Sequence, residues 1–178
     1  MGAEALPEPA ASLPEPAAVL PDPAASVPAW TLRPGTADDA AVIAELRAVV
    51  MRPDLERLYR YDEHRVRHRF LDGYRPEHTR VIEADGELVG CIASRVEDDA
   101  VWIEHFYLAT GVQGRGIGGA VLRRVMLEDG RADRPFRLDV LRGSGARRLY
   151  DRHGFRWERP EGEWDEILVA PPLGSAAR

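Results

Sequence analysis

The feature that most constrains the fold lies in residues 101–128, where an apolar strand pattern leads into a glycine-rich loop and then a helix pattern. Five glycines fall between residues 111 and 119. Glycine lets the backbone adopt positive φ and lets a ligand approach the main chain closely. The first amides of a helix have no partner inside it, and with the helix dipole they favour an anion. This order of strand, loop and helix predicts an anion site suited to a pyrophosphate.

Apolar periodicity and turn residues extend this unit on both sides. The predicted strands cover residues 30–33, 79–84, 87–96, 101–108, 136–141, 155–158 and 166–169, and the predicted helices cover 40–51, 62–71, 116–128 and 145–152. An Asp-Gly pair at 85–86 indicates a hairpin, and Pro53 is expected to end the first helix. The order is that of an α/β protein in which an antiparallel hairpin feeds a parallel crossover unit.

Residues 1–28 have a different composition from the rest of the chain. Three copies of a seven-residue unit with two prolines each fill residues 6–26. Two prolines per unit exclude a coiled coil, because each removes a backbone donor and clashes with the preceding turn. We expect a disordered tail with polyproline-like stretches, followed by one domain over residues 29–178. The tail lacks the pattern of a signal peptide. A docking site for a proline-binding module is the alternative interpretation.

Composition excludes several classes of protein. The formal net charge of −6 argues against general nucleic-acid binding. No apolar run approaches the roughly 20 residues that span a bilayer, so no membrane partner is expected. The single cysteine, Cys91, cannot form an internal disulfide and is expected to lie in the core. The dispersed histidines lack zinc-ligand spacing, so no metal is expected. This cysteine usage fits a cytoplasmic location.

Two kinds of nucleotide-binding loop fit the glycine pattern. The glycines at 114, 116 and 119 match the dinucleotide fingerprint, and Asp139 follows near where a ribose-binding acid would stand. However, Asp139 falls in mid-strand, and the loop comes late in the chain, after an antiparallel hairpin. That order leaves no room for a doubly wound sheet. A nicotinamide-binding fragment is therefore the weaker interpretation.

The second interpretation depends on two motifs. The segment QGRGIG at 113–118 follows a strand and resembles the cofactor signature of the GNAT superfamily of N-acetyltransferases. The segment LDV at 138–140, followed by ARRLYDRHGF at 146–155, resembles a later motif of the same superfamily. The resemblance covers about residues 30–170 and excludes the proline-rich tail. It implies an α/β (α+β) fold with a mixed, mostly antiparallel sheet of six to seven strands, about four flanking helices and splayed central strands.

This resemblance implies direct transfer of an acetyl group from acetyl-CoA, as co-substrate, to an amine. The strands carrying Phe106–Leu108 and Leu138–Leu141 should splay apart, so that the pantetheine arm bonds to unpaired backbone groups in the gap. The superfamily often carries an asparagine at the position of Gly143, and Ser144 is a candidate to replace its contact. The other expected cofactor-binding residues are Phe106, Tyr107, Leu108, Gln113, Gly114, Arg115, Gly116, Ile117, Gly118 and Gly119.

Two side chains suit the proton transfers of such a reaction. Tyr150 holds the position of the superfamily's usual general acid, and a packed core tyrosine is the structural alternative. Glu104 lies nine residues before Gln113, where members that use a base on this strand can carry it. A salt bridge to an arginine is the structural alternative for Glu104.

Strand alternation predicts which face these groups occupy. It places Glu104 on the face that carries three apolar side chains, those of Trp102, Phe106 and Leu108. His105 is expected on the opposite face and is the weaker base candidate. A water chain is the remaining alternative for the base.

The acceptor is expected to be an amine of unknown identity, either a small molecule or the N-terminus of a peptide or protein. The charged segment 51–76 should shape its pocket, but mixed charge on a helix does not identify a substrate. A transferase of a longer acyl group and a regulatory module that binds acyl-CoA without turnover are the alternative functions. The resemblance also allows a homodimer.

Overall fold

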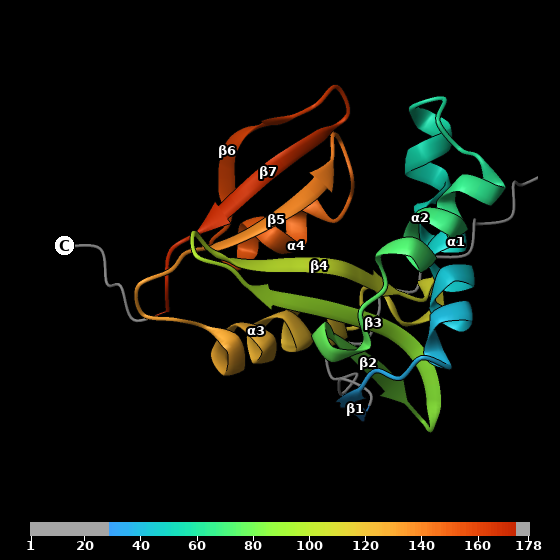
Figure 1. Cartoon of the computed structure of the whole chain (residues 1–178), viewed down its shortest axis with the longest axis horizontal. Coiled ribbons are helices and arrows are strands. Elements are labelled where there is room, and N and C mark those ends of the chain that lie inside the picture. Colours follow the sequence, from blue (N-terminus) through green and yellow to red (C-terminus); the bar gives the residue numbers. More distant parts are fainter. Residues whose placement is uncertain (1–28, 174–178) are drawn as a thin grey trace, which may run out of the picture.

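The structure is a computed structural model that describes residues 29–173. The expected proline-rich tail at 1–28 lies outside the described residues. Helices and strands follow in the order that the sequence predicts (Figure 1). The strands are β1 (Trp30–Pro34), β2 (Thr79–Ala84), β3 (Glu87–Val96), β4 (Val101–Leu108), β5 (Phe136–Leu141), β6 (Arg156–Glu161) and β7 (Asp165–Ala170). The helices are α1 (Asp39–Arg57), α2 (Glu63–Gly73), α3 (Ile117–Asp129) and α4 (Arg147–Arg152).

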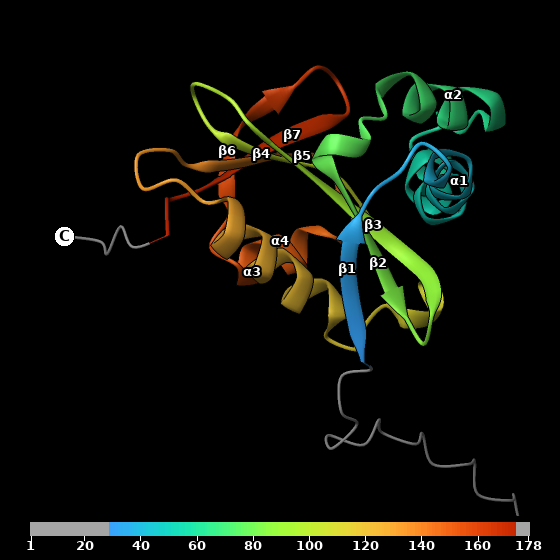
Figure 2. The ribbon, with the colours of Figure 1, turned by 60° about the horizontal axis from the view of Figure 1, so that its bottom comes forward.

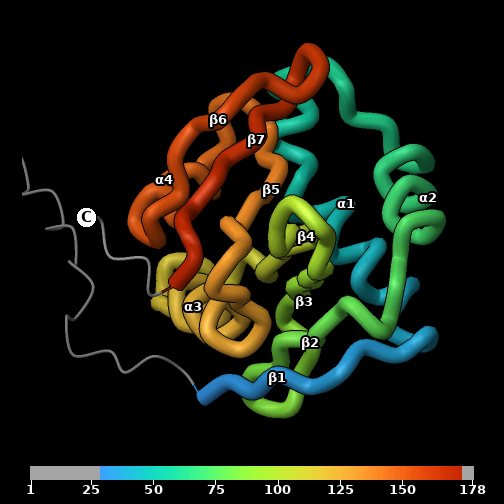
Figure 3. Tube along the Cα trace, turned by 60° about the vertical axis from the view of Figure 1, so that its left-hand side comes forward, coloured from blue at the N-terminus to red at the C-terminus, as the bar shows by residue number. Residues whose placement is uncertain are grey.

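The seven strands form one sheet in the order β1-β2-β3-β4-β5-β7-β6, which can be followed in Figure 3. All neighbours are antiparallel except β4 and β5, which are parallel and are joined by the crossover through α3. The expected mixed, mostly antiparallel sheet is therefore confirmed. The parallel pair lies at the centre of the sheet, where the glycine-rich loop leaves β4.

Helices cover both faces of the sheet, with α1 and α2 on one side and α3 and α4 on the other (Figure 2). Strand alternation divides the apolar residues between two cores. Ile82 and Ile92 belong to the larger cluster, which includes buried residues of α3. Val81 and Cys91 belong to the smaller cluster, which includes Phe70 of α2. Each face of the sheet therefore has its own core. A site between the central strands β4 and β5 can be reached from both faces.

The first helix is longer than the sequence predicts. Pro53 lies inside α1, which continues to Arg57. Proline lacks the N–H that would bond to the carbonyl of Val49, but its fixed φ is compatible with a helix, so one lost bond does not end α1. Beyond Pro53, the N–H of Leu58 bonds to the carbonyl of Asp54 at 3.2 Å. The added turn extends α1 toward the second half of the chain, where Arg57 Nη2 donates to the carbonyl of Arg142 at 2.6 Å.

Two arginine–carboxylate contacts anchor helices that border the site. Arg80 of β2 donates from both terminal nitrogens to Asp129, at the end of α3, over 2.6 Å each. Arg33 of β1 contacts both carboxylate oxygens of Asp39, at the start of α1, at 2.7 and 2.8 Å. Bidentate contacts of this kind fix orientation as well as distance. They hold α1 and α3 against opposite faces of the sheet.

Candidate functional site

The central strands β4 and β5 pair only at their beginnings. Their parallel ladder consists of Val101–Phe136, Trp102–Arg137 and Ile103–Leu138. Beyond it, β5 continues along β7, while β4 continues along β3, so the two strands separate. The expected splay is confirmed. Past Ile103, the edge of β4 that faces β5 has no strand partner among the described residues. Its backbone donors and acceptors are left for a ligand that carries amide groups.

A cavity of about 1070 Å³ occupies this gap. One part borders the loop before α3 and the first turns of α3 and α4, with Gly118 and Leu149 in its wall. The other part lies under α1 and α2 and reaches Trp164 in the β6–β7 turn. We call the second part the acceptor half. A cavity that joins a helix N-terminus on one side of a sheet to a second compartment on the other can hold two reactants at once.

The loop before α3 has the geometry expected of an anion site. Gly114 and Gly116 have φ of 74° and 87°, and Gly116 caps α3 without a side-chain hydrogen bond. Side chains rarely adopt this left-handed conformation, which explains why glycine stands at both positions. Within residues 29–173, the first amides of α3 therefore have no capping side chain and remain available for a phosphate group.

Two other glycines of the loop serve close packing. A Cβ on Gly118 would lie 3.2 Å from Leu108 Cδ1, and one on Gly119 would lie 3.2 Å from His153 Cε1. The absence of side chains here lets α3 approach both β4 and α4. Gly118 and Gly119 also line the cavity, so they bring the helix backbone to the position of a ligand.

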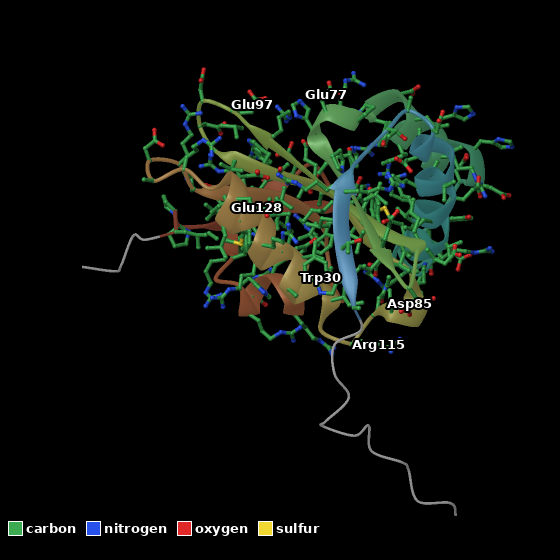
Figure 4. The ribbon with its side chains drawn as sticks, turned by 90° about the horizontal axis from the view of Figure 1, so that it is seen from below. Trp30, Glu77, Asp85, Glu97, Arg115 and Glu128 are labelled. Carbon is green, nitrogen blue, oxygen red and sulfur yellow. The ribbon has the colours of Figure 1, made fainter. Side chains whose placement is uncertain are left out.

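The expected cofactor-binding residues divide into two groups. Most of them line the cavity, namely Phe106, Tyr107, Leu108, Gln113, Gly114, Gly118, Gly119 and Ser144. Arg115, Gly116 and Ile117 are not among the lining residues. Ile117 is fully buried in the larger core, so only its backbone can serve a ligand. Arg115 lies at the edge of the molecule, at the same end as Trp30 (Figure 4). Their roles stay predictions.

The Gln113 side chain has a structural contact. Its Nε2 atom donates to the carbonyl of Leu108 at 2.7 Å. This carbonyl ends β4, so the contact holds the glycine loop against the strand from which it leaves. Gln113 therefore positions the loop, in addition to bordering the cavity.

A β-bulge changes the predicted faces of β4. Cys91 of β3 pairs with Tyr107, whereas Ala93 pairs with Glu104, so two residues of β4 lie opposite one of β3. The bulge includes His105, which has φ of 48°. Because Cys91 and Ala93 share a face, Glu104 and Tyr107 share it too, under α1 and α2.

The prediction that Glu104 shares its face with Phe106 and Leu108 is therefore wrong. Both of these residues pack on the larger core with α3, and only Trp102 stays on the face of Glu104. The prediction that His105 points to the opposite face is also wrong. Its ring packs against Phe70 of α2, with centroids 5.1 Å apart. Regular alternation cannot predict this arrangement, because the bulge inserts one residue into the repeat.

Glu104 lies in the cavity wall and is paired. Its Oε1 atom accepts a hydrogen bond from Arg95 Nη2 at 3.1 Å, and both side chains are about one-third exposed (36% and 37%). Arg95 also contacts Glu97. The structure thus contains the salt bridge considered from the sequence, while leaving the carboxylate at the cavity surface. A partly hydrated carboxylate in this place remains able to accept a proton through water.

His105 forms a small network with two neighbours. Its Nδ1 atom lies 3.3 Å from the hydroxyl of Tyr107, which accepts a hydrogen bond from Arg47 Nε at 2.9 Å. Burial lowers the pKa of His105, which keeps the imidazole neutral at pH 7. Burial raises the pKa of Tyr107. His105 is therefore a neutral group in the cavity wall, beside Glu104.

Tyr150 lies at the junction of α4 with the cavity. Its side chain is 7% exposed and packs against Phe155, with ring centroids 5.9 Å apart. No hydrogen bond links its hydroxyl to another of the described residues 29–173. Burial raises the pKa of Tyr150, which keeps the phenol protonated over the whole physiological range. Tyr150 is thus a packed tyrosine whose protonated phenol borders the cavity, and its role as general acid stays a prediction.

The β5–α4 loop places Ser144 in the cavity wall, next to a glycine with positive φ. Gly143 has φ of 72°, and a Cβ there would lie 3.2 Å from Arg57 Nη1. An asparagine at this position would tolerate the positive φ, but its Cβ would crowd the Arg57 side chain. The Ser144 hydroxyl accepts a hydrogen bond from the N–H of Ala146 at 3.3 Å. A contact from Ser144 to pantetheine stays a prediction.

Cys91 lies in the smaller core, as expected. It is fully buried, and its Sγ donates to the carbonyl of His105 at 3.0 Å. Burial raises the pKa of the thiol, so the reactive thiolate is disfavoured. Cys91 supports the bulge and takes no part in the cavity.

The acceptor half contains charged residues that the motifs do not indicate. Asp139 and Asp165 enter it from β5 and β7, Arg69 from α2, and Arg60 and Trp164 from the loops above. Asp139 stood out in the sequence only as the ribose-binding acid of the weaker interpretation. Its polar side chain between buried Leu138 and Val140 was the one available signal. The others belong to charged segments or loops, where the spacing of residues does not predict which way a side chain points.

Within residues 29–173, no three histidine, cysteine or acidic side chains gather in an arrangement that could hold a metal ion. Within the same range, no helix has the length and apolar character needed to cross a membrane.

This chain resembles a known family in sequence and solved structures in fold. Residues 75–157 match the family model of the acetyltransferase (GNAT) domain. Among solved structures, PaiA N-acetyltransferase of Thermoplasma acidophilum in complex with coenzyme A superposes with a TM-score of 0.66, at 18% identity over 80% of this chain and 99% of that chain. An N-acetyltransferase of Staphylococcus aureus Mu50 gives a TM-score of 0.61, at 18% identity over 79% and 100%. No curated protein matches the sequence.

A mixed sheet whose parallel central strands splay beside a glycine-capped helix defines the N-acetyltransferase fold class, to which both solved structures belong. With the family match over residues 75–157, the resemblance of this chain to the GNAT superfamily is confirmed. The match spans the loop before α3 and α4, the two places where the sequence motifs lie. The dinucleotide interpretation is wrong, because the only parallel pair among the described strands is β4–β5.

Proposed function

We propose that this protein transfers the acetyl group of acetyl-CoA directly to an amine acceptor. The observation that carries the proposal is the single cavity that joins the glycine loop, the splay and the acceptor half, with Tyr150 and Glu104 in its walls. The residues present fit acetyl-CoA, which supplies an activated acetyl thioester. The open amides at the start of α3 suit its pyrophosphate, and the unpaired edge of β4 suits its amide-containing arm.

We assign the two proton transfers to residues on either side of the splay. An amine attacks a thioester only as the free base, so its ammonium must first lose a proton. Glu104 accepts this proton through water, from its place in the acceptor half. As the amine nitrogen bonds to the acetyl carbon, the carbon–sulfur bond breaks, and the hydroxyl of Tyr150 donates its proton to the sulfur. The acetylated nitrogen then releases its surplus proton, which restores the Tyr150 hydroxyl through water. His105 is the alternative base, because it is neutral and borders the same compartment.

For the acceptor, we propose a chemical class, an amine, and no particular compound. The E. coli ribosomal-protein-S18-alanine N-acetyltransferase superposes with a TM-score of 0.59, at 18% identity over 84% of this chain and 97% of that chain. Such likeness concerns the fold, so both small amines and peptide N-termini belong in a screen. A cytoplasmic location and a homodimer stay predictions.

The test follows thiol release from acetyl-CoA while the acceptor is varied. The panel includes amino acids, polyamines, aminoglycosides and peptides with a free N-terminus, and mass spectrometry identifies the acetylated product. Turnover with one class of amine is the expected result. Calorimetry that detects acetyl-CoA binding without turnover on any amine would instead favour the regulatory module. Faster turnover with a longer acyl-CoA would favour the longer acyl group.

A further inference from the structure

The acceptor half contains two carboxylates that form no ion pair within the described part of the chain. Within residues 29–173, Asp139 and Asp165 take part in no ion pair and no side-chain hydrogen bond. The neighbouring acids differ, because Glu104 pairs with Arg95 and Glu161 pairs with Arg159. Asp139 and Asp165 therefore remain as the free negative charges of this compartment.

These two carboxylates are close neighbours on one face of the sheet. Asp139 pairs with Ile167 and Leu141 pairs with Asp165, which makes the two aspartates diagonal neighbours on adjacent strands. Burial, followed by the negative charges of Asp165 and Glu161, raises the pKa of Asp139 to about 6. Burial also raises the pKa of Asp165. Two neighbouring carboxylates without an ion-pair partner, of which Asp139 is exposed and Asp165 is partly buried, form a place where a bound ammonium group can be held.

Their position relates them to the reaction. Asp139 directly follows Leu138, which forms the last ladder pair with Ile103 of β4. Its carboxylate therefore stands where the strands begin to separate, in the wall of the acceptor half. An ammonium group held there lies beside the gap that is proposed to hold the thioester.

The opposite wall carries two arginines that have neither an acidic partner nor a side-chain hydrogen bond within residues 29–173. Among the described residues, Arg60 and Arg69 form no ion pair, although both border the cavity. The positive charge of Arg69 counteracts the rise in the pKa of Asp139, and both arginines counteract that of Asp165. Arg159 and Arg142 act in the same direction, but each of them has an acidic partner of its own. Figure 1 shows α2, which carries Arg69, on the opposite side of the molecule's upper end from β5 and β7.

A third donor lies beside the arginines. The guanidinium carbon of Arg60 lies 5.4 Å from the ring centroid of Trp164. The indole Nε1 of Trp164 is buried and has no hydrogen-bond acceptor among the described residues. A buried donor without a partner is rare in folded proteins and calls for an explanation. An anionic group bound between Arg60 and Trp164 would provide its acceptor.

We infer that the acceptor is a dipolar small molecule, an amino acid or a related amine with a carboxylate, bound between these walls. Its ammonium group contacts Asp139 and Asp165, and its carboxylate contacts Arg69, Arg60 and the Trp164 indole. Polyamines and aminoglycosides would leave the arginines unsatisfied, and a peptide N-terminus lacks the nearby carboxylate. The inference rests on the proposed function, because it names the substrate class of the same site.

The first experiment compares amino acids with their own amides, which keep the amine and lose the negative charge. Hydrogen bonds to charged groups contribute about 1.5–3 kcal/mol, so kcat/KM should be about 10- to 100-fold higher for the acid than for the amide. Calorimetry with the same pairs, in the presence of coenzyme A, measures the preference without turnover. Equal affinity for acid and amide, or no binding of any amino acid, overturns the inference.

Substitutions then test which residues bind the ammonium end and the carboxylate end of the acceptor. Arg69→Gln should raise KM for the amino acid about 10- to 100-fold and leave the amide unchanged. Trp164→Phe keeps the ring and removes the donor, so it should act in the same direction with a smaller effect. Arg67→Gln is the matched control on α2, because Arg67 pairs with Glu45 outside the cavity. Asp139→Asn should weaken acid and amide alike. An Arg69→Gln enzyme with an unchanged preference overturns the inference.

The outcomes separate this inference from the proposed function. Turnover of a polyamine or an aminoglycoside, with no activity on amino acids, keeps the acetyltransferase and rejects the dipolar acceptor. Amino-acid binding without turnover on any amine keeps the dipolar site and rejects the enzyme.

Discussion

Glu104 and Tyr107 lie on the same face of β4 although they are three positions apart in the chain, an odd spacing that a regular strand would place on opposite faces. The bulge at His105 and Phe106 produces this relationship, and the left-handed φ of 48° at His105 makes it possible. A bulge at this point places two consecutive polar side chains, Glu104 and His105, in the wall of the acceptor half. Bulges beside active sites commonly redirect side chains in this way.

The strain at His105 is testable through stability. His105→Val and His105→Asn both remove the imidazole, but asparagine tolerates positive φ and a β-branched side chain does not. The valine variant should be less stable than the asparagine variant by about 1–2 kcal/mol. Urea denaturation of both proteins measures the difference. Equal stability would show that the bulge relaxes to a regular strand when the ring is lost.

Replacing Glu104 tests the base. Glu104→Gln keeps the shape and removes the basicity, so kcat should fall by about 10²-fold at neutral pH, the lower end for general base catalysis. The rate should recover as pH rises, because a larger fraction of the acceptor amine is then deprotonated without a general base. Arg95→Gln is the matched control, since it breaks the same ion pair and leaves the carboxylate. A pH profile of Glu104→Gln that follows wild type would transfer the role to His105.

Replacing Tyr150 tests the acid. Tyr150→Phe removes only the hydroxyl, and the ring can keep its contact with Phe155. We expect kcat to fall by about 10²-fold, because a thiolate is already a fair leaving group. Acetyl-CoA affinity, measured by calorimetry, should change little, since most proposed contacts come from the backbone. Full activity in this variant would leave Tyr150 with a packing role alone.

Local patterns were sufficient to predict most of the fold. The sequence predicts β2, β3, β4 and β5 with the bounds that the structure has, because alternation and the Asp85–Gly86 turn are local signals. The splay between β4 and β5 followed from the resemblance to the superfamily and is confirmed. The end of α1 was wrong, because a single proline costs one hydrogen bond while the rest of the helix ladder persists.

The site was harder to predict than the fold. The glycine loop has a signature because its backbone needs glycine at fixed positions, such as Gly114 and Gly116. The acceptor half has none, because it joins side chains from elements far apart in the chain, such as Arg60 and Trp164. Their proximity depends on tertiary packing, and charged residues in loops carry no periodic signal.

The ion pair between Arg33 and Asp39 makes stability depend on pH. Hydrogen bonds from Arg33 hold the pKa of Asp39 well below its usual range. A depressed pKa contributes stability above the unfolded value of about 3.9, and this stability is lost as pH falls below it. Asp39→Asn should therefore cost about 1.5–3 kcal/mol at pH 7 and less at pH 3. Urea titrations at both pH values measure this, with the exposed neighbour Asp38→Asn as a control that should change little.

The loop before α3 provides the sharpest test of cofactor binding. Gly116→Asp places a side chain at φ of 87° and adds a negative charge beside the proposed pyrophosphate site. Like-charge contacts cost several kcal/mol, so acetyl-CoA affinity should fall by at least about 100-fold in calorimetry. Gly111→Asp is the matched control, because its Cβ would meet no atom within 4 Å and its backbone is not left-handed. Circular dichroism verifies that both variants fold. If Gly116→Asp binds acetyl-CoA as tightly as Gly111→Asp, the cofactor does not bind at the start of α3.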